Sequence, residues 1–355
     1  MPTPTIETSA PVLVTGATGY VAGRLVERLL TDGLTVHATV RDPSKTERLA
    51  YLNDLADASP GSIVFFAADL TQEGSFAEAM QGCSVVFHVA SPFISGAADP
   101  QKTLVEPAVG GTRNVLEQAN ATPSVKRVVL TSSCAAIYGD NSDAKDLPGG
   151  VFTEEIWNTS SSLTHNAYSY SKTLAEREGW KIHDSQSAWS LVTINPCLVM
   201  GPGVRIHSTS ESFSLMKQMG DGSFKSGAPD LGVGVVDVRD VAEAHFQAAF
   251  RESASGRYIT AGHNTSLPKM ADALRARFSA YPLPKRTLPK FVVWLFGPML
   301  NSTLTRTYVS RNIGWPWKGD NSKSIRELGM TYRPLEDTLG EFFQQLVDAG
   351  ELKAP

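Results

Sequence analysis

The fold of this chain is decided by APVLVTGATGYVAGRLVERLL, residues 10–30. Its VLV run predicts a short buried strand, and an amphipathic helix follows the glycine-marked turn at once. Gly16 and Gly19 allow a turn so tight that the backbone can approach a pyrophosphate. The helix N-terminus directs unpaired N–H groups and a partial positive charge at the same place. The stretch therefore predicts a dinucleotide-binding turn, and the alternative is an ordinary strand, turn and helix.

Length and composition indicate a globular protein. The 355 residues, of which 42% are hydrophobic, suffice for about two lobes. Lys and Arg number 32 against 36 Asp and Glu, a net charge of −4, so nothing favours nucleic acid or an anionic membrane as a partner. The N-terminus has no basic leader, and the longest apolar run, residues 291–300, is half a membrane span. We expect a cytoplasmic protein without a membrane anchor.

The cysteines Cys83, Cys134 and Cys197 are odd in number, widely spaced and set in apolar runs. This pattern is typical of buried, reduced thiols in a cytosolic protein. No His and Cys pairs have the spacing of metal ligands. We therefore expect three reduced thiols and no metal site.

The end of the second predicted strand, residues 34–40, is where the adenosine ribose of a dinucleotide lies. An acidic residue about 20 positions past the glycines binds the ribose 2′-hydroxyl, whereas an arginine there binds a 2′-phosphate. Arg41 follows Gly23 by 18 positions, and Lys45 comes four residues later. We interpret Arg41 as a phosphate ligand and predict NADP(H) as the cofactor. The alternatives are a solvated surface arginine, or Asp42 as the ribose ligand.

Polar and small residues follow the later strands, at the edge where ligands of open α/β sheets collect. Asp69 is a candidate partner for the adenine amino group, and its alternative role is an N-cap for the next helix. His88 precedes the end of its strand and is interpreted as a packed core histidine. These strands are predicted at residues 63–67, 85–90, 128–130 and 190–194.

A tyrosine and a lysine open the helix predicted at residues 166–185. Tyr168 and Lys172 are four residues apart and therefore share one helix face. An ammonium beside a phenol favours the phenolate and lowers the tyrosine pKa from about 10, which suits a proton donor near neutral pH. The alternative is an exposed polar pair. Tyr170 is offset by two residues from Lys172 and lies on another face.

The alternation of strands and helices predicts an α/β Rossmann fold, a doubly wound parallel sheet with a smaller, mostly helical C-terminal substrate lobe. Residues 8–200, rejoined by residues 233–262, form the predicted NADP-binding domain. Residues 201–232 and 263–355 form the predicted substrate-binding lobe.

Two segments are expected near the substrate. Residues 139–164 are rich in Asp, Gly, Ser and Pro and predict a surface loop that can act as a flap. The aromatic residues between 291 and 317 are interpreted as the lining of a substrate cavity, with an ordinary lobe core as the alternative.

Taken together, these segments resemble the extended short-chain dehydrogenase/reductases, in the branch of dihydroflavonol reductases, cinnamoyl-CoA reductases and microbial aldehyde or carbonyl reductases. The resemblance covers nearly the whole chain and preserves the order and spacing of the motifs. The matching segments are Thr15-Gly-Ala-Thr-Gly-Tyr-Val-Ala22, Val40-Arg-Asp-Pro43, Ala68-Asp-Leu70, His88-Val-Ala-Ser-Pro92, Thr131-Ser-Ser133, Tyr168-x-x-x-Lys172, Asn195-Pro196 with Gly201-Pro202, and Val236-Asp-Val-Arg-Asp-Val-Ala242.

The resemblance implies roles for three residues. Tyr168 is the expected catalytic acid and base, and Lys172 lowers its pKa and binds the nicotinamide ribose. Ser133, preferred over Ser132 as the second serine of its motif, holds the substrate oxygen. Cys134 departs from the pattern, since some sugar-nucleotide relatives have their catalytic serine there.

The expected contacts with the cofactor follow from the strand ends and the matching segments together. The residues concerned are Gly16, Thr18, Gly19, Tyr20, Val21, Arg41, Lys45, Asp69, Leu70, Val89, Ala90, Ser91, Thr131, Tyr168, Lys172, Pro196, Leu198 and Val199.

The implied reaction is the NADPH-dependent reduction of an aldehyde or ketone to an alcohol, by a monomer or homodimer acting on a small-molecule carbonyl substrate. A nucleotide-sugar epimerase or dehydratase is the first alternative. Such relatives need phosphate-binding cations in the second lobe, whereas this lobe is aromatic. A non-catalytic NADP-sensing regulator is the second alternative, and the tyrosine-lysine pair counts against it.

Overall fold

The computed structural model of the chain describes residue 6 and residues 9–91, 99–300 and 303–353. Pro92, expected to end the fourth strand, lies outside the described residues.

A seven-stranded sheet forms the centre of the molecule, and every neighbouring pair in it is parallel. The strand order is β10-β6-β5-β4-β1-β2-β3. Sequence order reverses between β1 and β4, and the carboxyl ends of strands at such a reversal form the ligand crevice of a doubly wound sheet. The expected Rossmann fold is confirmed. The strands are β1 (Val12–Val14), β2 (Thr35–Val40), β3 (Ser62–Ala67), β4 (Val85–His88), β5 (Arg127–Thr131), β6 (Ser190–Pro196) and β10 (Gly256–Thr260).

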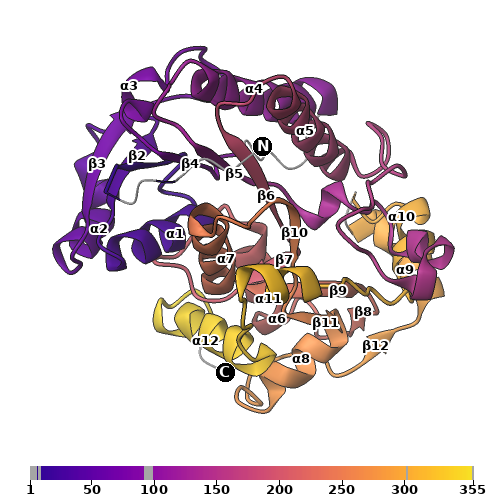
Figure 1. Cartoon of the computed structure of the whole chain (residues 1–355). Coiled ribbons are helices and arrows are strands. Elements are labelled where there is room, and N and C mark those ends of the chain that lie inside the picture. The colour runs from indigo at the N-terminus through magenta and orange to yellow at the C-terminus, as the bar shows by residue number, and fades with distance from the viewer. Residues whose placement is uncertain (1–5, 7–8, 92–98, 301–302, 354–355) are drawn as a thin grey trace.

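Helices cover both faces of this sheet (Figure 1). Helices α1 (Tyr20–Thr31), α2 (Thr46–Asp57) and α7 (Val238–Phe250) pack on one face, and α3 (Ala77–Met80), α4 (Glu106–Asn120) and α5 (Ala167–Asp184) on the other. Strand β1 serves both cores because successive strand residues point to opposite faces: Val12 and Val14 contact the α1 side, and Leu13 the α4 side. A strand buried on both faces needs the continuous apolar run that its sequence has.

The second lobe packs around a core of methionine, leucine and phenylalanine side chains. Its small sheet has the strand order β11-β9-β7, in which β11 and β9 are antiparallel and β9 and β7 are parallel. Of residues 233–262, which are predicted to rejoin the NADP-binding domain, β9 lies in this small sheet, whereas α7 and β10 pack on or in the large sheet. The elements are β7 (Leu198–Met200), α6 (Glu211–Gly220), β8 (Ala228–Pro229), β9 (Gly232–Asp237), β11 (His263–Ser266), α8 (Leu267–Arg275), β12 (Thr287–Leu288), α9 (Lys290–Leu300), α10 (Arg306–Asn312), α11 (Ser322–Leu328) and α12 (Leu335–Asp348).

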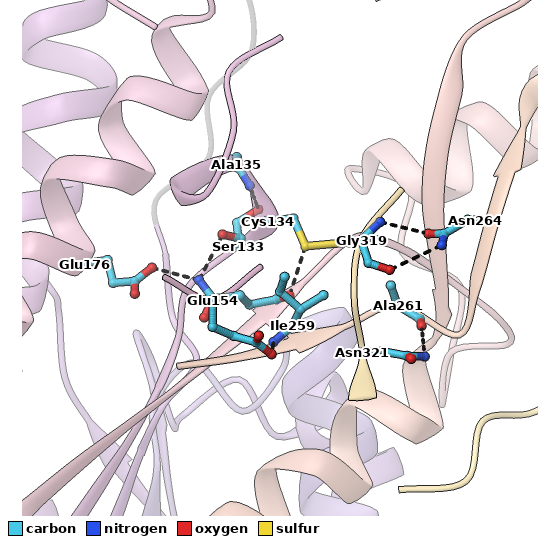
Figure 2. The surroundings of a disulfide bond; sticks show 12 residues. Ser133, Cys134, Ala135, Glu154, Glu176, Ile259, Ala261, Asn264, Gly319 and Asn321 are labelled. Carbon is cyan, nitrogen blue, oxygen red and sulfur yellow. Dashed lines mark hydrogen bonds between the residues drawn. A yellow bond between two sulfur atoms is a disulfide. The ribbon is translucent and has the colours of Figure 1, made fainter. Parts of the chain in front are cut away.

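A disulfide joins Cys134 to Cys197, with the two Cα atoms 5.1 Å apart (Figure 2). The expectation of three reduced thiols is therefore wrong for this pair, and Cys83 alone is free and buried. The reason is the register of the sheet. Thr131 of β5 lies opposite Ile194 of β6 in a parallel pair. Cys134 and Cys197 each come three residues later, so they are neighbours as well. A separation of 63 residues conceals that proximity in the sequence.

We expect the disulfide to stabilise the folded chain. Closing a loop of this length lowers the entropy of the unfolded state, and removing such a bond costs about 2–4 kcal/mol. Dithiothreitol should therefore lower the urea midpoint of the wild type and leave that of Cys197→Ala unchanged. Titration of thiols in denaturant without reductant should find one, and finding all three would contradict the bond.

Candidate active site

The glycine-marked turn follows β1 at the edge of the sheet where the strand order reverses. Gly16 has φ +64°, and a Cβ built on it would lie 2.9 Å from the Cβ of Ala90, so no larger residue fits there. The amide of Gly19 donates to the Gly16 carbonyl over 2.9 Å, and α1 begins at the next residue. The turn brings backbone to an open helix N-terminus, as a phosphate cradle requires.

Thr15 connects this turn to the end of β4. Its hydroxyl accepts from the amides of Val89 (3.0 Å) and Ala90 (2.9 Å) and donates to Nδ1 of His88 over 3.1 Å. Burial lowers the pKa of His88 to about 3, with a further contribution from Lys172, so this imidazole is neutral and accepts the bond. The interpretation of His88 as a core histidine is confirmed, since it is 2% exposed.

Tyr20 was expected at the cofactor, and its ring points instead into the second lobe. The ring lies against Phe213 (5.2 Å between centroids) and Phe342 (6.1 Å). Its hydroxyl donates to the carbonyl of Gly201 over 2.5 Å, and nearby Arg24 donates to the carbonyl of Pro202 over 2.9 Å. Only the backbone of Tyr20 remains available at the turn.

Arg41 and Asp42, the two candidate ligands for the adenosine ribose of the cofactor, have different partners. Asp42 accepts from the amide (3.1 Å) and hydroxyl (2.6 Å) of Ser44, and its second oxygen pairs with Lys45 at 3.2 Å. The Ser44 hydrogen bond is the largest cause of the lowered Asp42 pKa. Arg41 is exposed and forms no ion pair within the described residues. The local turn thus engages Asp42 through Ser44, and Lys45 pairs with the same carboxylate.

Asp69 has one oxygen engaged. Its Oδ1 accepts from the amide (2.8 Å) and hydroxyl (2.7 Å) of Thr71. The next helix, α3, begins only at Ala77, so Asp69 caps a turn and not the helix that the sequence suggested. Beside it, Leu70 lies against Gly111 of α4, where a Cβ would meet the leucine at 3.2 Å.

Helix α5 brings the tyrosine and the lysine to the crevice. Lys172 is 8% exposed, its Nζ donates to the Ser91 hydroxyl over 3.0 Å, and it lies 6.0 Å from the centre of the Tyr168 ring. Burial lowers the pKa of Lys172 to about 8, against the attraction of Glu176. Tyr168 retains 38% exposure at the crevice.

The structure moves the pKa of Tyr168 in the opposite direction from the one that its spacing to Lys172 predicts. The spacing predicted a lowered value, whereas desolvation raises the pKa to about 12 although 38% of the residue is exposed, and a hydrogen bond with Ser133 opposes that rise. The lysine has little effect because its Nζ is bound to Ser91 at a distance from the ring. Tyr168 therefore holds its proton at neutral pH.

The two serines after β5 have different partners. The Ser132 hydroxyl donates to the carboxylate of Glu176 and is buried. The Ser133 hydroxyl accepts from the amide of Ala135 over 3.1 Å and contacts Tyr168. The structure thus brings Ser133 and Tyr168 together and turns Ser132 away into the interior. Sequence reasoning missed Glu176, although its position one turn after Lys172 on the same helix face was a usable signal.

Of the remaining expected contacts, Thr131 and Pro196 lie at the ends of β5 and β6, and Leu198 and Val199 lie in β7 of the small sheet. Thr131 is committed to another partner, since its hydroxyl donates to Nε2 of His245 over 2.7 Å. His245 in turn donates from Nδ1 to the carbonyl of Val241, and burial lowers its pKa to about 4. Pro196 ends β6, and Leu198 begins β7.

The aromatic segment of the second lobe divides between surface and core. On α9, Phe291 (71%) and Phe296 (51%) are exposed. Trp317 is 2% exposed and lies 5.8 Å from Tyr138 and 6.2 Å from Phe152 between ring centres. The core alternative holds for Trp317, and the cavity interpretation stays a prediction for the others.

Two kinds of comparison bear on this geometry. Residues 12–262 match the NAD-dependent epimerase/dehydratase family. The chain is 36% identical to a cinnamoyl-CoA reductase of Medicago truncatula over 94% of this chain and 95% of that protein. It is 35% identical to tetraketide alpha-pyrone reductase 1 of Arabidopsis thaliana over 96% of each chain.

The chain belongs to the NAD-dependent epimerase/dehydratase family. Within it, the chain is an extended short-chain dehydrogenase/reductase of the reductase branch, as its motifs suggested. The yeast methylglyoxal/isovaleraldehyde reductase Gre2, solved as a complex with NADPH, shares the fold with a TM-score of 0.75 and 26% identity, over 96% of this chain and 100% of that one.

Among the residues that the structure describes, no helix is long and apolar enough to cross a membrane. The same residues contain no group of three His, Cys, Asp or Glu side chains placed to hold a metal ion.

We expect Gly16→Ala to weaken cofactor binding strongly. The methyl group would strain the backbone at φ +64° and collide with Ala90, displacing the turn. Gly33→Ala is the matched control, because it has the same kind of backbone strain (φ +83°) and nothing within 4 Å of the new methyl. Fluorescence titration with NADPH should show at least about a tenfold loss of affinity for the first variant, a difference of about 1.4 kcal/mol. Equal affinities in the two variants would contradict the cradle.

Proposed function

We propose that this protein reduces an aldehyde or ketone to an alcohol with NADPH. The observation that carries the proposal is the convergence of Ser133, Tyr168 and Lys172 at the edge of the sheet that follows the glycine-marked turn. The hydride for the carbonyl carbon would come from NADPH held at that turn. Tyr168 donates its proton to the carbonyl oxygen as negative charge develops there, and Ser133 hydrogen bonds to that oxygen.

The protonation states in the structure suit the reductive direction. Tyr168, with a pKa raised to about 12, keeps its proton available at neutral pH. Lys172, with a pKa of about 8, is cationic below that pH, which suits a role at the cofactor rather than at the phenol. The Lys172 ammonium also has donors to spare beyond the Ser91 bond, which suits a ribose hydroxyl.

The residues around the turn fit a dinucleotide. The Gly16 cradle leaves no room for a side chain, as a pyrophosphate site demands, and the amides of the α1 N-terminus face it. Oδ2 of Asp69 is left for the adenine amino group, since Oδ1 binds Thr71. The exposed guanidinium of Arg41 supports NADPH over NADH because Asp42 is engaged by its own turn.

The positions of these residues indicate different roles for the two lobes. We infer that the large sheet and its helices bind the cofactor, and that the lobe around α6, α8 and α12 shapes the substrate side. The reductase relatives differ in the substrates that their names give, so the substrate class must come from experiment. Following NADPH absorbance against aliphatic aldehydes, aryl ketones, dihydroflavonols and acyl-CoA thioesters tests the proposal. If none of these compounds causes oxidation of NADPH, the proposal is overturned.

Tyr168→Phe should remove turnover while leaving NADPH affinity and thermal stability nearly unchanged. Only the proton-donating hydroxyl is lost, and the ring keeps its packing. The check is steady-state kinetics beside a fluorescence titration and a melting curve. Tyr170→Phe is the control, and a result in which that variant alone is inactive would move the acid by two residues.

Arg41→Ala should weaken NADPH binding roughly ten- to a hundredfold and leave NADH little changed. Charge-assisted hydrogen bonds to the 2′-phosphate contribute about 1.5–3 kcal/mol, and NADH cannot form them. Dissociation constants of both cofactors for wild type and variant measure the effect, with Asp42→Asn as a control expected to change neither greatly. Equal losses for the two cofactors, or a wild type that prefers NADH, would show that Asp42 binds the ribose.

A further inference from the structure

A buried carboxylate lies one helical turn beyond Lys172, and the reaction proposed above gives it no part. Glu176 of α5 is 1% exposed. Its carboxylate accepts from Ser132 at the end of β5, from Nδ2 of Asn195 on β6 (2.8 Å) and from Nε of Arg257 on β10 (2.6 Å). One side chain thus connects a helix to three strands of the large sheet.

Asn195 carries this connection to the catalytic serine. Its side-chain amide donates to Glu176 and, over 3.1 Å, to the carbonyl of Ser133. Glu176 and Ser133, both labelled in Figure 2, are thus joined through this amide. The Thr193 hydroxyl lies 3.2 Å from Oδ1 of Asn195 and 3.3 Å from Oε1 of Glu176, so its one proton can bond to either acceptor. With both of its N–H groups engaged, Asn195 holds the main chain of Ser133 in one position.

Arg257 binds backbone carbonyls around the turn that follows Ser133. Its Nη1 donates to the carbonyls of Glu154 (2.8 Å) and Ile156 (2.6 Å), and its Nη2 to that of Ala136 (3.3 Å). Ala136 belongs to the short helical turn that starts after Ser133, and the other two carbonyls belong to the expected flap. The guanidinium is therefore satisfied, and its pairing with the carboxylate offsets much of the cost of burying both charges.

We propose that Glu176 is a positioning residue for carbonyl reduction, which orients Asn195 and through it holds Ser133 against Tyr168. The inference rests on the proposed function, because it assigns Ser133 to the substrate oxygen. The competing account is a structural ion pair that only fastens β10 to α5. The two accounts differ in whether a small change at Glu176 reaches Ser133.

Glu176→Gln tests the two accounts because it keeps the size of the side chain, replaces one acceptor by a donor and removes the charge that pairs with Arg257. An amide N–H₂ in place of the carboxylate oxygen Oε2 would face the N–H₂ of Asn195, and two donors cannot bond to each other. The opposite orientation is disfavoured, since it would set the new N–H₂ against Nε of Arg257, which has no acceptor to offer. Asn195 therefore turns its oxygen toward residue 176, which breaks its bond to the Ser133 carbonyl. Trp180→Phe is the matched control, since it removes another donor to Glu176 (Nε1 at 3.3 Å) and leaves the path to Ser133 intact.

Kinetics on the full-length protein provide the first test. With a carbonyl substrate that the wild type reduces, Glu176→Gln should lower kcat about tenfold, as expected for loss of one oriented hydrogen bond, with the NADPH dissociation constant within about twofold. Trp180→Phe should retain near-normal kcat. Equal kcat losses in the two variants would overturn the proposal.

A double-mutant cycle tests the route through the serine. In the Ser133→Ala background, Glu176→Gln should cost little further kcat, because the group that it positions is already absent. A structural ion pair would cost the same factor in both backgrounds, and that additive result would overturn the proposal.

Backbone exchange provides a readout that needs no turnover. Hydrogen–deuterium exchange of residues 132–137 should speed up in Glu176→Gln and stay at the wild-type rate in Trp180→Phe, because the Ser133 carbonyl also accepts from the amide of Ala136. Unchanged exchange in both would contradict the inference. A wild type that reduces no carbonyl would instead overturn the proposed function, and the exchange rates would still test whether Glu176 holds the turn.

Discussion

A carboxylate closed off from water must obtain from protein groups the solvation that water would otherwise supply, and Glu176 obtains it from α5, β5, β6 and β10 together. Removing one partner of such a buried pair costs about 3–5 kcal/mol, since the other charge remains unpaired. Each strand must therefore arrive in the one register that presents its donor. The same register sets Ser133 beside Tyr168 and aligns Cys134 with Cys197. The site and the sheet thus depend on one set of contacts.

Features that depend on neighbours in the chain were predictable from the sequence. The turn at Gly16 is recognisable because strand, glycines and helix follow one another directly, and the structure has each of them in place. The spacing of Tyr168 and Lys172 needs only the period of a helix. The parallel sheet follows from apolar runs that alternate with helices. Family resemblance then assigned roles that spacing alone left open.

Features that depend on strand register were not predictable. Cys134 and Cys197 meet because β5 pairs with β6, and no property of either cysteine reveals it. The bond from Lys172 to Ser91 spans 81 residues and changes the electrostatics expected for Tyr168. Burial decides the tyrosine pKa, and the sequence does not state burial.

The first helix also belongs to the second lobe. Tyr20 begins the helix of the glycine-marked turn, and its ring completes the phenylalanine core formed by residues from α6 and α12. Arg24, one turn later, donates to the carbonyls of Pro202 and Gly203. Cutting the chain after the sheet would leave both side chains without these partners and would expose the apolar core that Tyr20 covers. The helix that opens the glycine-marked turn therefore couples the packing of the second lobe to the position of the turn itself.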